Sequence, residues 1–176
     1  MRKILNSELG RASQSQYEAM DKLPVVIVLD NVRSGNNIGS FFRTADAFGL
    51  QEIILCGICA CPPSRDIHKT ALGAESTVKW SYCESTVDAI ERLKGEGYTT
   101  LSIEQVEGAT MLNKLELYTQ KRYAIVFGNE VEGVSQQAVD ACHGAIEIPQ
   151  VGTKHSINVS VCGGVVLWEF FKQLSK

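Results

Sequence analysis

The sequence has no apolar run of the roughly 18 residues that a transmembrane helix needs. Its opening stretch, MRKILNSELGRASQSQYEAM, lacks the apolar centre of a signal peptide, so we expect a cytoplasmic protein with no membrane association. An excess of positive charge is also missing, because 17 basic and 20 acidic residues give a net charge of −3. Overall charge therefore does not indicate nucleic-acid binding, and any bound nucleic acid would need local basic patches.

Three motifs of common α/β enzymes are absent as well. Neither the G-x-G-x-x-G fingerprint nor the G-x-x-x-x-G-K-[ST] phosphate loop is present after the first apolar run. The sequence contains no G-x-S-x-G nucleophile elbow, and no histidine has an obvious Ser or Cys partner in sequence. These absences argue against a Rossmann dehydrogenase, a P-loop enzyme and an α/β hydrolase.

Cysteine spacing supplies only half of a metal site. The stretch CGICAC contains one C-x-x-C pair, which suits half of a zinc site, but no second pair or nearby histidine completes four ligands. The other cysteines stand singly among apolar neighbours, as buried free thiols often do. We therefore favour free thiols over a metal site, and in a cytoplasmic chain of this size we expect no disulfide framework.

Six apolar runs predict β-strands, at residues 25–30, 52–55, 77–82, 99–104, 123–128 and 145–149. The first, VVIVLD, is a continuous run typical of a buried parallel strand. Helical patterns lie between the strands, at residues 38–49, 67–76, 85–97 and 135–142, whereas 105–121 predicts a turn and a weak helix. This alternation predicts an α/β fold with a mostly parallel six-stranded sheet and helices on both faces.

The chain divides into a short N-terminal arm, residues 1–23, and one domain, residues 24–176. The arm has a helical pattern with Tyr17 and Met20 as candidate anchors. At 176 residues the chain is long enough to bury a sizeable core as a single domain.

The last long segment, residues 146–171, combines an apolar helix with surplus polar side chains. A helix at the edge of a domain usually has one apolar stripe. Here apolar residues fall on two sides: Ile157, Val161, Val165 and Trp168 on one, and Val159, Val166 and Phe170 on the other. We therefore expect cover on both sides. Helix capping explains Ser156 but not the polar residues Asn158 and Ser160, so this region is a candidate site.

Two further loops follow predicted strands, and ligands of open α/β sheets gather at the carboxyl ends of strands. Residues 31–37 precede a helix that contains Arg43, and the start of that helix could bind an anion through free N–H groups. The loop NEVEGV holds Glu130 near two glycines that allow a sharp turn. Either loop could instead be ordinary, with Asn37 as a helix cap and Arg43 solvated.

Taken together and in order, the three loops resemble the SpoU family of RNA 2′-O-methyltransferases, in the SPOUT class. The motifs that carry this resemblance are NIGSFFRTADAFG, IVFGNEVEGVS and IPQVGTKHSINVSV. The match extends over nearly the whole chain from Val25 to Phe171. Three positions depart from the family pattern, namely Gln150, Ile157 and Cys162, and none of them removes a polar group that the chemistry needs.

The resemblance implies an α/β fold with a C-terminal trefoil knot, an obligate homodimer and S-adenosylmethionine as the methyl donor. It places the cofactor in the knot, held largely by main chain near Ser102, Gly128, Ile148 and Ile157. The implied reaction is methyl transfer to a ribose 2′-hydroxyl of structured RNA. The residues that the resemblance assigns to the reaction are Arg43, Asn37, Glu130, Ser156 and Asn158.

Two roles for Arg43 stay open at this stage. It could help to remove the proton of the hydroxyl, although a guanidinium rarely gives up its own proton. It could instead grip an RNA phosphate bidentately and place the hydroxyl for attack. The other four residues would hold Arg43 and the ribose in position.

Two other functions compete with this hypothesis, and the RNA substrate is a separate question. One rival is a non-catalytic RNA-binding protein on the same scaffold, since fold alone does not fix function. The other is an α/β enzyme with a nucleotide cofactor, which the missing fingerprints disfavour. About 24 residues precede the first strand, too few for an extra RNA-binding domain, and we favour tRNA over rRNA as the substrate.

Overall fold

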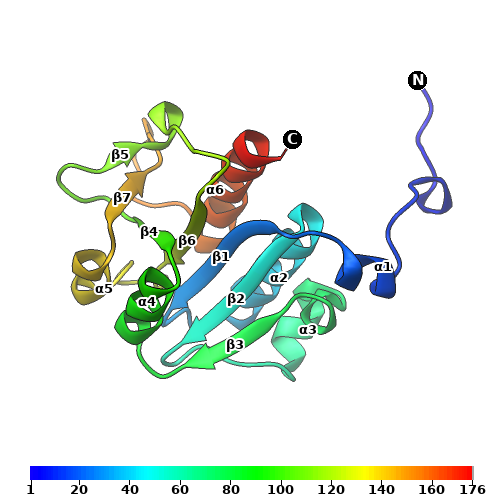
Figure 1. Cartoon of the computed structure of the whole chain (residues 1–176), viewed down its shortest axis with the longest axis horizontal. Helices are drawn as coiled ribbons and strands as arrows, with labels where there is room; N and C mark the ends of the chain where they lie inside the picture. The colour runs from blue at the N-terminus through cyan, green and yellow to red at the C-terminus, as the bar shows by residue number, and fades with distance from the viewer. Residues whose placement is uncertain (176) are drawn as a thin grey trace.

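The structure is a computed structural model that describes residues 1–175, so Lys176, the last residue of the predicted domain, lies outside the described residues. Within residues 1–175 the fold centres on one seven-stranded sheet in the order β3–β2–β1–β6–β4–β7–β5 (Figure 1). Every pairing between neighbouring strands is parallel. The strands are β1 (Leu23–Asp30), β2 (Leu50–Cys56), β3 (Trp80–Cys83), β4 (Tyr98–Ile103), β5 (Thr110–Met111), β6 (Arg122–Phe127) and β7 (Gly144–Glu147).

The prediction of an α/β fold with a parallel sheet is confirmed, but the predicted number of six strands is wrong. The additional strand is β5, which lies in the 105–121 stretch where the sequence predicted a turn and a weak helix. It has only two residues, and they pair with Ile146 and Glu147 at the edge of the sheet. A strand of two residues is too short to show an alternating pattern of apolar and polar residues in the sequence. It forms because it pairs with β7, which is distant in the sequence. The short 3₁₀ helix η3 (Leu112–Lys114) follows it.

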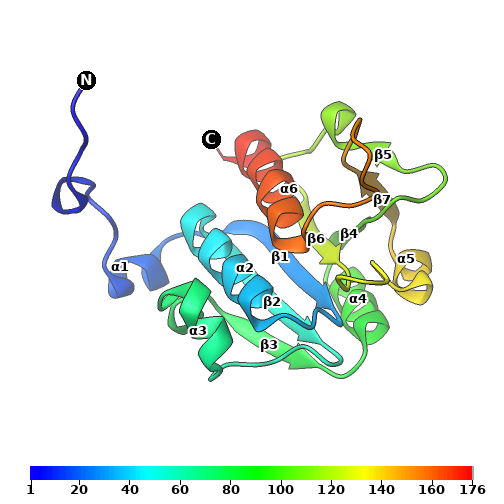
Figure 2. The same ribbon diagram turned by 180° about the vertical axis from the view of Figure 1, so that it is seen from behind.

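Helices cover both faces of the sheet, as predicted. One face carries α2 (Gly35–Phe48), α3 (Arg65–Ala71) and α6 (Val159–Leu174), and the other carries α4 (Thr86–Gly95) and α5 (Gln136–Ala141) (Figures 1 and 2). Each face has its own cluster of buried apolar residues, because the continuous apolar strands present side chains to both. None of the helices among residues 1–175 is both long and apolar enough to cross a membrane. The cytoplasmic location stays a prediction.

The N-terminal arm contains η1 (Asn6–Glu8) and α1 (Gln14–Ala19) and extends away from the sheet (Figures 1 and 2). Its anchor is Tyr17, which is buried and belongs to the larger apolar cluster. Met20, the other candidate anchor, is 43% exposed and does not belong to the core. The division into an arm and a domain at residue 24 stays a prediction.

Helix α2 begins earlier than predicted and is fixed tightly against α3. Ser34 is its N-cap and accepts a hydrogen bond from the Asn37 N–H at 3.3 Å, so Asn37 lies inside the first turn and does not cap the helix. The helix ends at Gly49 in the left-handed conformation, as predicted. A Cβ on Gly39 would lie 2.3 Å from the Ile67 carbonyl oxygen, so the two helices meet backbone to backbone.

Helix α6 begins later than predicted, because its N-cap is Asn158 and not Ser156. The Asn158 Oδ1 accepts hydrogen bonds from the N–H groups of Ser160 at 3.0 Å and Val161 at 3.3 Å. Asn caps helices as well as Ser does, and the sequence alone does not choose between two candidates this close. Ser156 consequently lies in the preceding loop.

The two apolar sides of α6 differ in their burial. Val166, Leu167 and Phe170 are fully buried against the sheet and α2. The other side stays open as a stripe of exposed apolar residues, which we call the α6 stripe: Ile157, Val161, Val165 and Trp168. The expected cover on the second side is therefore not supplied from within residues 1–175. The trefoil knot stays a prediction.

Candidate functional site

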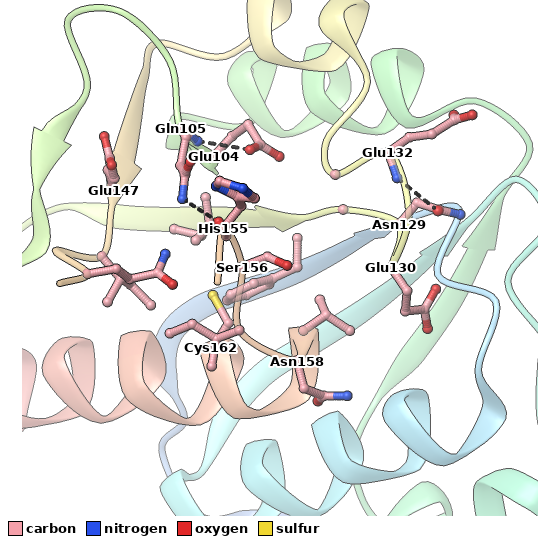
Figure 3. A pocket seen from close by; sticks show the side chains of 18 of the residues that line it. Glu104, Gln105, Asn129, Glu130, Glu132, Glu147, His155, Ser156, Asn158 and Cys162 are labelled. Atoms are coloured by element: carbon pink, nitrogen blue, oxygen red, sulfur yellow. Dashed lines mark hydrogen bonds between the residues drawn. The ribbon is translucent and has the colours of Figure 1, made fainter. Parts of the chain in front are cut away.

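A cavity of about 470 Å³ lies at the carboxyl ends of β4, β6 and β7, where the sequence predicted ligands to gather (Figure 3). Its walls come from the segment after β4, the loop after β6, and the loop between β7 and α6. The volume is within the range of about 300–1,000 Å³ that is usual for small-molecule sites. The cavity is therefore large enough for a nucleoside-sized ligand.

The first wall is the tight loop of residues 128–135. Asn129 and Gly133 close it through two backbone hydrogen bonds, each 2.9 Å long. A Cβ on Gly128 would lie 2.0 Å from the carbonyl carbon of Gly133, so only glycine fits at that position. The loop is therefore closed on itself at Gly128, which lines the cavity together with Asn129, Glu130, Val131 and Glu132.

Two carboxylates fix the end of this loop. Glu104 Oε2 accepts a hydrogen bond from the Val134 N–H at 2.8 Å, and Asp30 Oδ2 accepts one from the Ser135 N–H at 2.9 Å. Asp30 is buried, and its other oxygen accepts a hydrogen bond from the Thr86 hydroxyl at 2.6 Å. Sequence reasoning missed both residues, although each stands at or next to the end of a predicted strand.

The second wall is the loop between β7 and α6. Its predicted cofactor residues Ile148 and Ile157 line the cavity, and so does Ser156. The Gln105 side-chain amide donates a hydrogen bond to the His155 carbonyl at 2.9 Å, which ties this loop to the segment after β4 (Figure 3). Gln105 was not predicted, and its position just after a strand end is the one signal that points to it.

Three of the predicted reaction residues form one hydrogen-bonded network across the three loops. Glu130 Oε1 accepts a hydrogen bond from the Asn37 amide at 2.9 Å, and the Asn158 amide donates to the Asn37 Oδ1 at 3.3 Å. Glu130 also accepts the backbone N–H groups of Arg33 and Ser34, each at 3.0 Å. One carboxylate therefore joins the loop after β6 to the N-terminus of α2, where a negative charge is favourable.

The hydrogen bonds of Glu130 lower the pKa of its carboxyl group. Partial burial raises this pKa, but hydrogen bonds from the Arg33 N–H, the Asn37 amide and the Ser34 N–H outweigh burial. The pKa in the folded state is thus below its usual value. Ionised Glu130 contributes stability above the unfolded pKa, and this contribution is lost as the pH falls through the folded pKa.

We expect the Glu130→Gln variant to lower the free energy of unfolding at pH 7, and to lower it less at pH 4. At pH 4 the native carboxylate begins to lose its advantage over the neutral amide. Urea unfolding of both proteins at the two pH values measures the difference. Glu132→Gln is the control, because the Glu132 carboxylate accepts no hydrogen bond from residues 1–175. A difference for Glu130→Gln that does not change with pH would contradict the assignment.

The structure does not place all the predicted site residues at the cavity. Gly128, Ile148 and Ile157 line it, whereas Ser102, the fourth predicted cofactor residue, is fully buried in β4 and does not. Glu130, Ser156 and Asn158 line the cavity, and Asn37 contacts it through its hydrogen bonds to two of them. The roles of these residues stay predictions.

Arg43 lies away from the cavity and lines a second, more open hollow of about 490 Å³ beside α2. Its side chain is exposed, and it forms no hydrogen bond or ion pair with any other part of residues 1–175. Asn37 and Arg43 are six residues apart, which is about 9 Å along a helix and about 120° around it. The two side chains therefore face different sides of α2.

The two hollows differ in charge. Four glutamates, Glu104, Glu130, Glu132 and Glu147, line the cavity, and no lysine or arginine among residues 1–175 does so. The second hollow contains Arg43 and Lys69 and no acidic residue from the described part of the chain. By electrostatics the cavity favours a cationic ligand and the second hollow an anionic one.

The cysteines are buried or half-buried free thiols. Burial raises the pKa of the Cys56 thiol to about 12 and that of Cys59 to about 11. Both thiols are therefore neutral at pH 7. Among residues 1–175, no group of three or more His, Cys, Asp or Glu side chains is placed to hold a metal ion.

Fold and site together define an α/β protein with a ligand cavity at the carboxyl edge of a parallel sheet, built from three loops. Residues 24–168 match the model of the SpoU rRNA Methylase family. The chain therefore belongs to that family, as its three motifs predicted.

Individual relatives agree with this membership. The chain is 30% identical over 159 residues to a Staphylococcus saprophyticus protein assigned to the TrmH family of tRNA/rRNA methyltransferases. This match includes 90% of the chain but 63% of that relative, so the chain spans less than two thirds of the relative's length.

Solved structures show the same fold. An S-adenosylmethionine-bound rRNA methyltransferase from Sinorhizobium meliloti superposes with a TM-score of 0.80 at 24% identity, covering 91% of this chain and 61% of that one. A second structure, described for the 2-OH methylation of C/U34 on tRNA, has a TM-score of 0.75 at 22% identity. That match covers 86% of this chain and 96% of the other.

Proposed function

We propose that this chain transfers a methyl group from S-adenosylmethionine to a ribose 2′-hydroxyl of structured RNA. The observation that carries the proposal is the hydrogen-bonded network of Glu130, Asn37 and Asn158, which joins the three family motifs beside the cavity. Membership of the SpoU family supports RNA methylation. The 2-OH methylation of tRNA described for one structural neighbour supports the ribose hydroxyl and a tRNA substrate.

The residues of the cavity fit S-adenosylmethionine. Ile148 and Ile157 offer apolar surface, and Gly128 exposes backbone groups that can bind polar edges. The glutamates of the lining suit the positive charges of the sulfonium and ammonium groups. When bound, this cofactor supplies a methyl group activated by a positively charged sulfur. The bound cofactor of the Sinorhizobium meliloti neighbour supports the same assignment.

Arg43 fits the role of gripping phosphate better than that of a base. Its side chain is exposed, and no carboxylate among residues 1–175 pairs with it, so the guanidinium is available to an RNA phosphate. A bidentate contact would hold the ribose in line for attack. The proton of the hydroxyl would then pass to phosphate or water.

We also propose that the active form is a homodimer, formed through the α6 stripe. The stripe is an exposed apolar surface formed by Ile157, just before α6, and by three residues of α6, and Gly164 of the same helix lines the hollow that contains Arg43. A second copy packed there would bring the Arg43 side of one chain towards the cavity of the other. This arrangement would explain why Arg43 does not line the cavity of its own chain. The trefoil knot implied by the family resemblance is part of the same proposal.

We expect Val161→Asp, in the centre of the α6 stripe, to halve the molecular mass in solution and to abolish methyl transfer. A charge would be buried without a partner in the dimer. The monomer should stay folded, because Val161 is in the first turn of α6, where Asp is favourable. Light scattering gives the mass and circular dichroism checks the fold. Leu72→Asp, at an exposed apolar position that caps the C-terminus of α3, is the control, and a Val161→Asp dimer would refute the proposed interface.

Radiolabelled methyl incorporation tests the proposed reaction. Purified protein and methyl-labelled S-adenosylmethionine are incubated separately with unmodified tRNA and with unmodified rRNA. We expect label in tRNA, in dinucleotides that resist alkaline hydrolysis, as 2′-O-methylation requires. Cofactor binding without incorporation into either RNA would instead favour the non-catalytic RNA-binding protein.

A further inference from the structure

The second hollow contains a lysine that the proposed reaction does not use. Lys69 of α3 lines this hollow together with Arg43 of α2, and these two residues are 26 positions apart in the sequence. The Lys69 side chain is exposed and makes no hydrogen bond or ion pair within the described chain. Three other lysines, by contrast, are paired with glutamates, namely Lys79, Lys94 and Lys172.

The positions of Lys69 and Arg43 are fixed by close helix packing. Gly39 of α2 faces α3 so closely that an added Cβ would lie 2.2 Å from the Thr70 hydroxyl. That hydroxyl donates a hydrogen bond to the Asn36 carbonyl at 2.8 Å, which ties the residue next to Lys69 to the first turn of α2. The two cations are thus carried by rigid elements, which favours a preformed site.

The chemistry of the hollow fits a phosphate diester. No acidic side chain from residues 1–175 lines it, and the two unpaired cations Arg43 and Lys69 do. Arg65 lies one turn before Lys69 on α3, so both project from the same face and extend the positive charge beyond the hollow. In a chain with a net charge of −3, this concentration of unpaired positive charge is local.

We infer that the hollow between α2 and α3 binds a backbone phosphate of the RNA substrate, with Lys69 as a phosphate-binding residue beside Arg43. This inference rests on the proposed function, because RNA is the polyanion that the reaction requires. The acidic cavity would then bind the cationic cofactor, and the basic hollow would bind the anionic RNA backbone.

Salt dependence of RNA binding tests the inference, with a fluorescent pool of unmodified tRNA transcripts as the probe and no cofactor present. Each phosphate contact contributes about 0.7–0.9 to the slope of log affinity against log salt concentration. We expect Lys69→Ala to reduce the slope by about this amount, which corresponds to about four- to fivefold weaker binding at 0.15 M salt. Lys69→Glu should weaken binding further.

The control is Lys114→Ala, at an exposed lysine in η3 near the opposite edge of the sheet. It removes the same charge and should leave the slope unchanged. An unchanged slope in Lys69→Ala, equal losses in both variants, or no binding by the unaltered protein would each overturn the inference. A change of molecular mass in Lys69→Glu without a change of RNA affinity would also overturn it, and would assign the hollow to contact between copies.

Binding is measured here without methyl transfer, so the two proposals fail separately. A smaller slope of log affinity against log salt concentration in Lys69→Ala supports the phosphate site even where no methyl group is incorporated. Normal incorporation with an unchanged slope would keep the reaction and remove the phosphate site.

Discussion

Replacing Arg43 with alanine is expected to lower the rate of methyl transfer by roughly 10³-fold or more, which abolishes it in practice. The affinity for S-adenosylmethionine should stay nearly unchanged. Loss of a group that positions a reactant or assists proton transfer typically costs about 10²–10⁴-fold. Cofactor affinity should be unchanged because Arg43 lines the second hollow and not the cavity. Methyl incorporation and calorimetric titration with the cofactor measure the two quantities side by side.

Arg43→Lys separates charge from geometry in this experiment. Lysine keeps the positive charge but loses the planar fork that binds a phosphate bidentately. We expect this variant to retain RNA binding better than Arg43→Ala and still to transfer methyl groups slowly. Arg92→Ala, at a half-exposed arginine of α4 on the other face of the sheet, is the control. Normal turnover in Arg43→Ala would refute the assignment.

The Gly128→Ala variant should lose cofactor affinity, by about ten- to hundredfold. Its Cβ would lie 2.0 Å from the Gly133 carbonyl carbon and 2.1 Å from the Val134 nitrogen, so the loop must open to admit it. Overpacking of this kind costs about 1–3 kcal/mol, and 1.4 kcal/mol corresponds to a factor of ten in affinity. Calorimetric titration gives the affinity, and a thermal melt shows how much of the cost falls on stability.

Gly152→Ala is the matched control for this variant. Gly152 lies in the loop on the other side of the cavity, and an added Cβ there meets no atom within 4 Å. Its backbone is not in the left-handed region, so alanine adds no strain. Wild-type affinity is expected, and equal losses in the two variants would show that the tight loop has no special part in binding.

The sequence predicted the sheet well because its signals are local. The run that became β1 is continuous and apolar, and Gly49 ends α2 in the left-handed conformation that glycine adopts readily. The strand β5 was missed because its two residues depend on pairing with β7, which no local pattern encodes. The start of α6 was misplaced by two residues because two good capping residues, Ser156 and Asn158, stand close together.

The sequence predicted those site residues that belong to a family motif. It did not predict the residues that reach the site only through contacts between distant parts of the chain. Family motifs identified Glu130, Asn37 and Asn158, which the structure joins by hydrogen bonds. Asp30, by contrast, accepts a hydrogen bond from the Ser135 N–H, and the two residues are 105 positions apart in the sequence. Local sequence patterns carry no information about a contact over that separation. The separation of Arg43 from Asn37, by contrast, follows from the helical repeat once both are placed on one helix.

The contrast between the two walls of the cavity has a thermodynamic consequence. The loop of residues 128–135 is already ordered, because its N–H groups at Val134 and Ser135 are bonded to carboxylates. The loop of residues 150–157 is exposed throughout, and Gln105 is its one side-chain hydrogen-bond donor from elsewhere in residues 1–175. The entropy lost when the cofactor binds should therefore come mostly from the second loop. Amide hydrogen exchange would detect this as protection that appears on binding in 150–157 and exists beforehand at Val134 and Ser135.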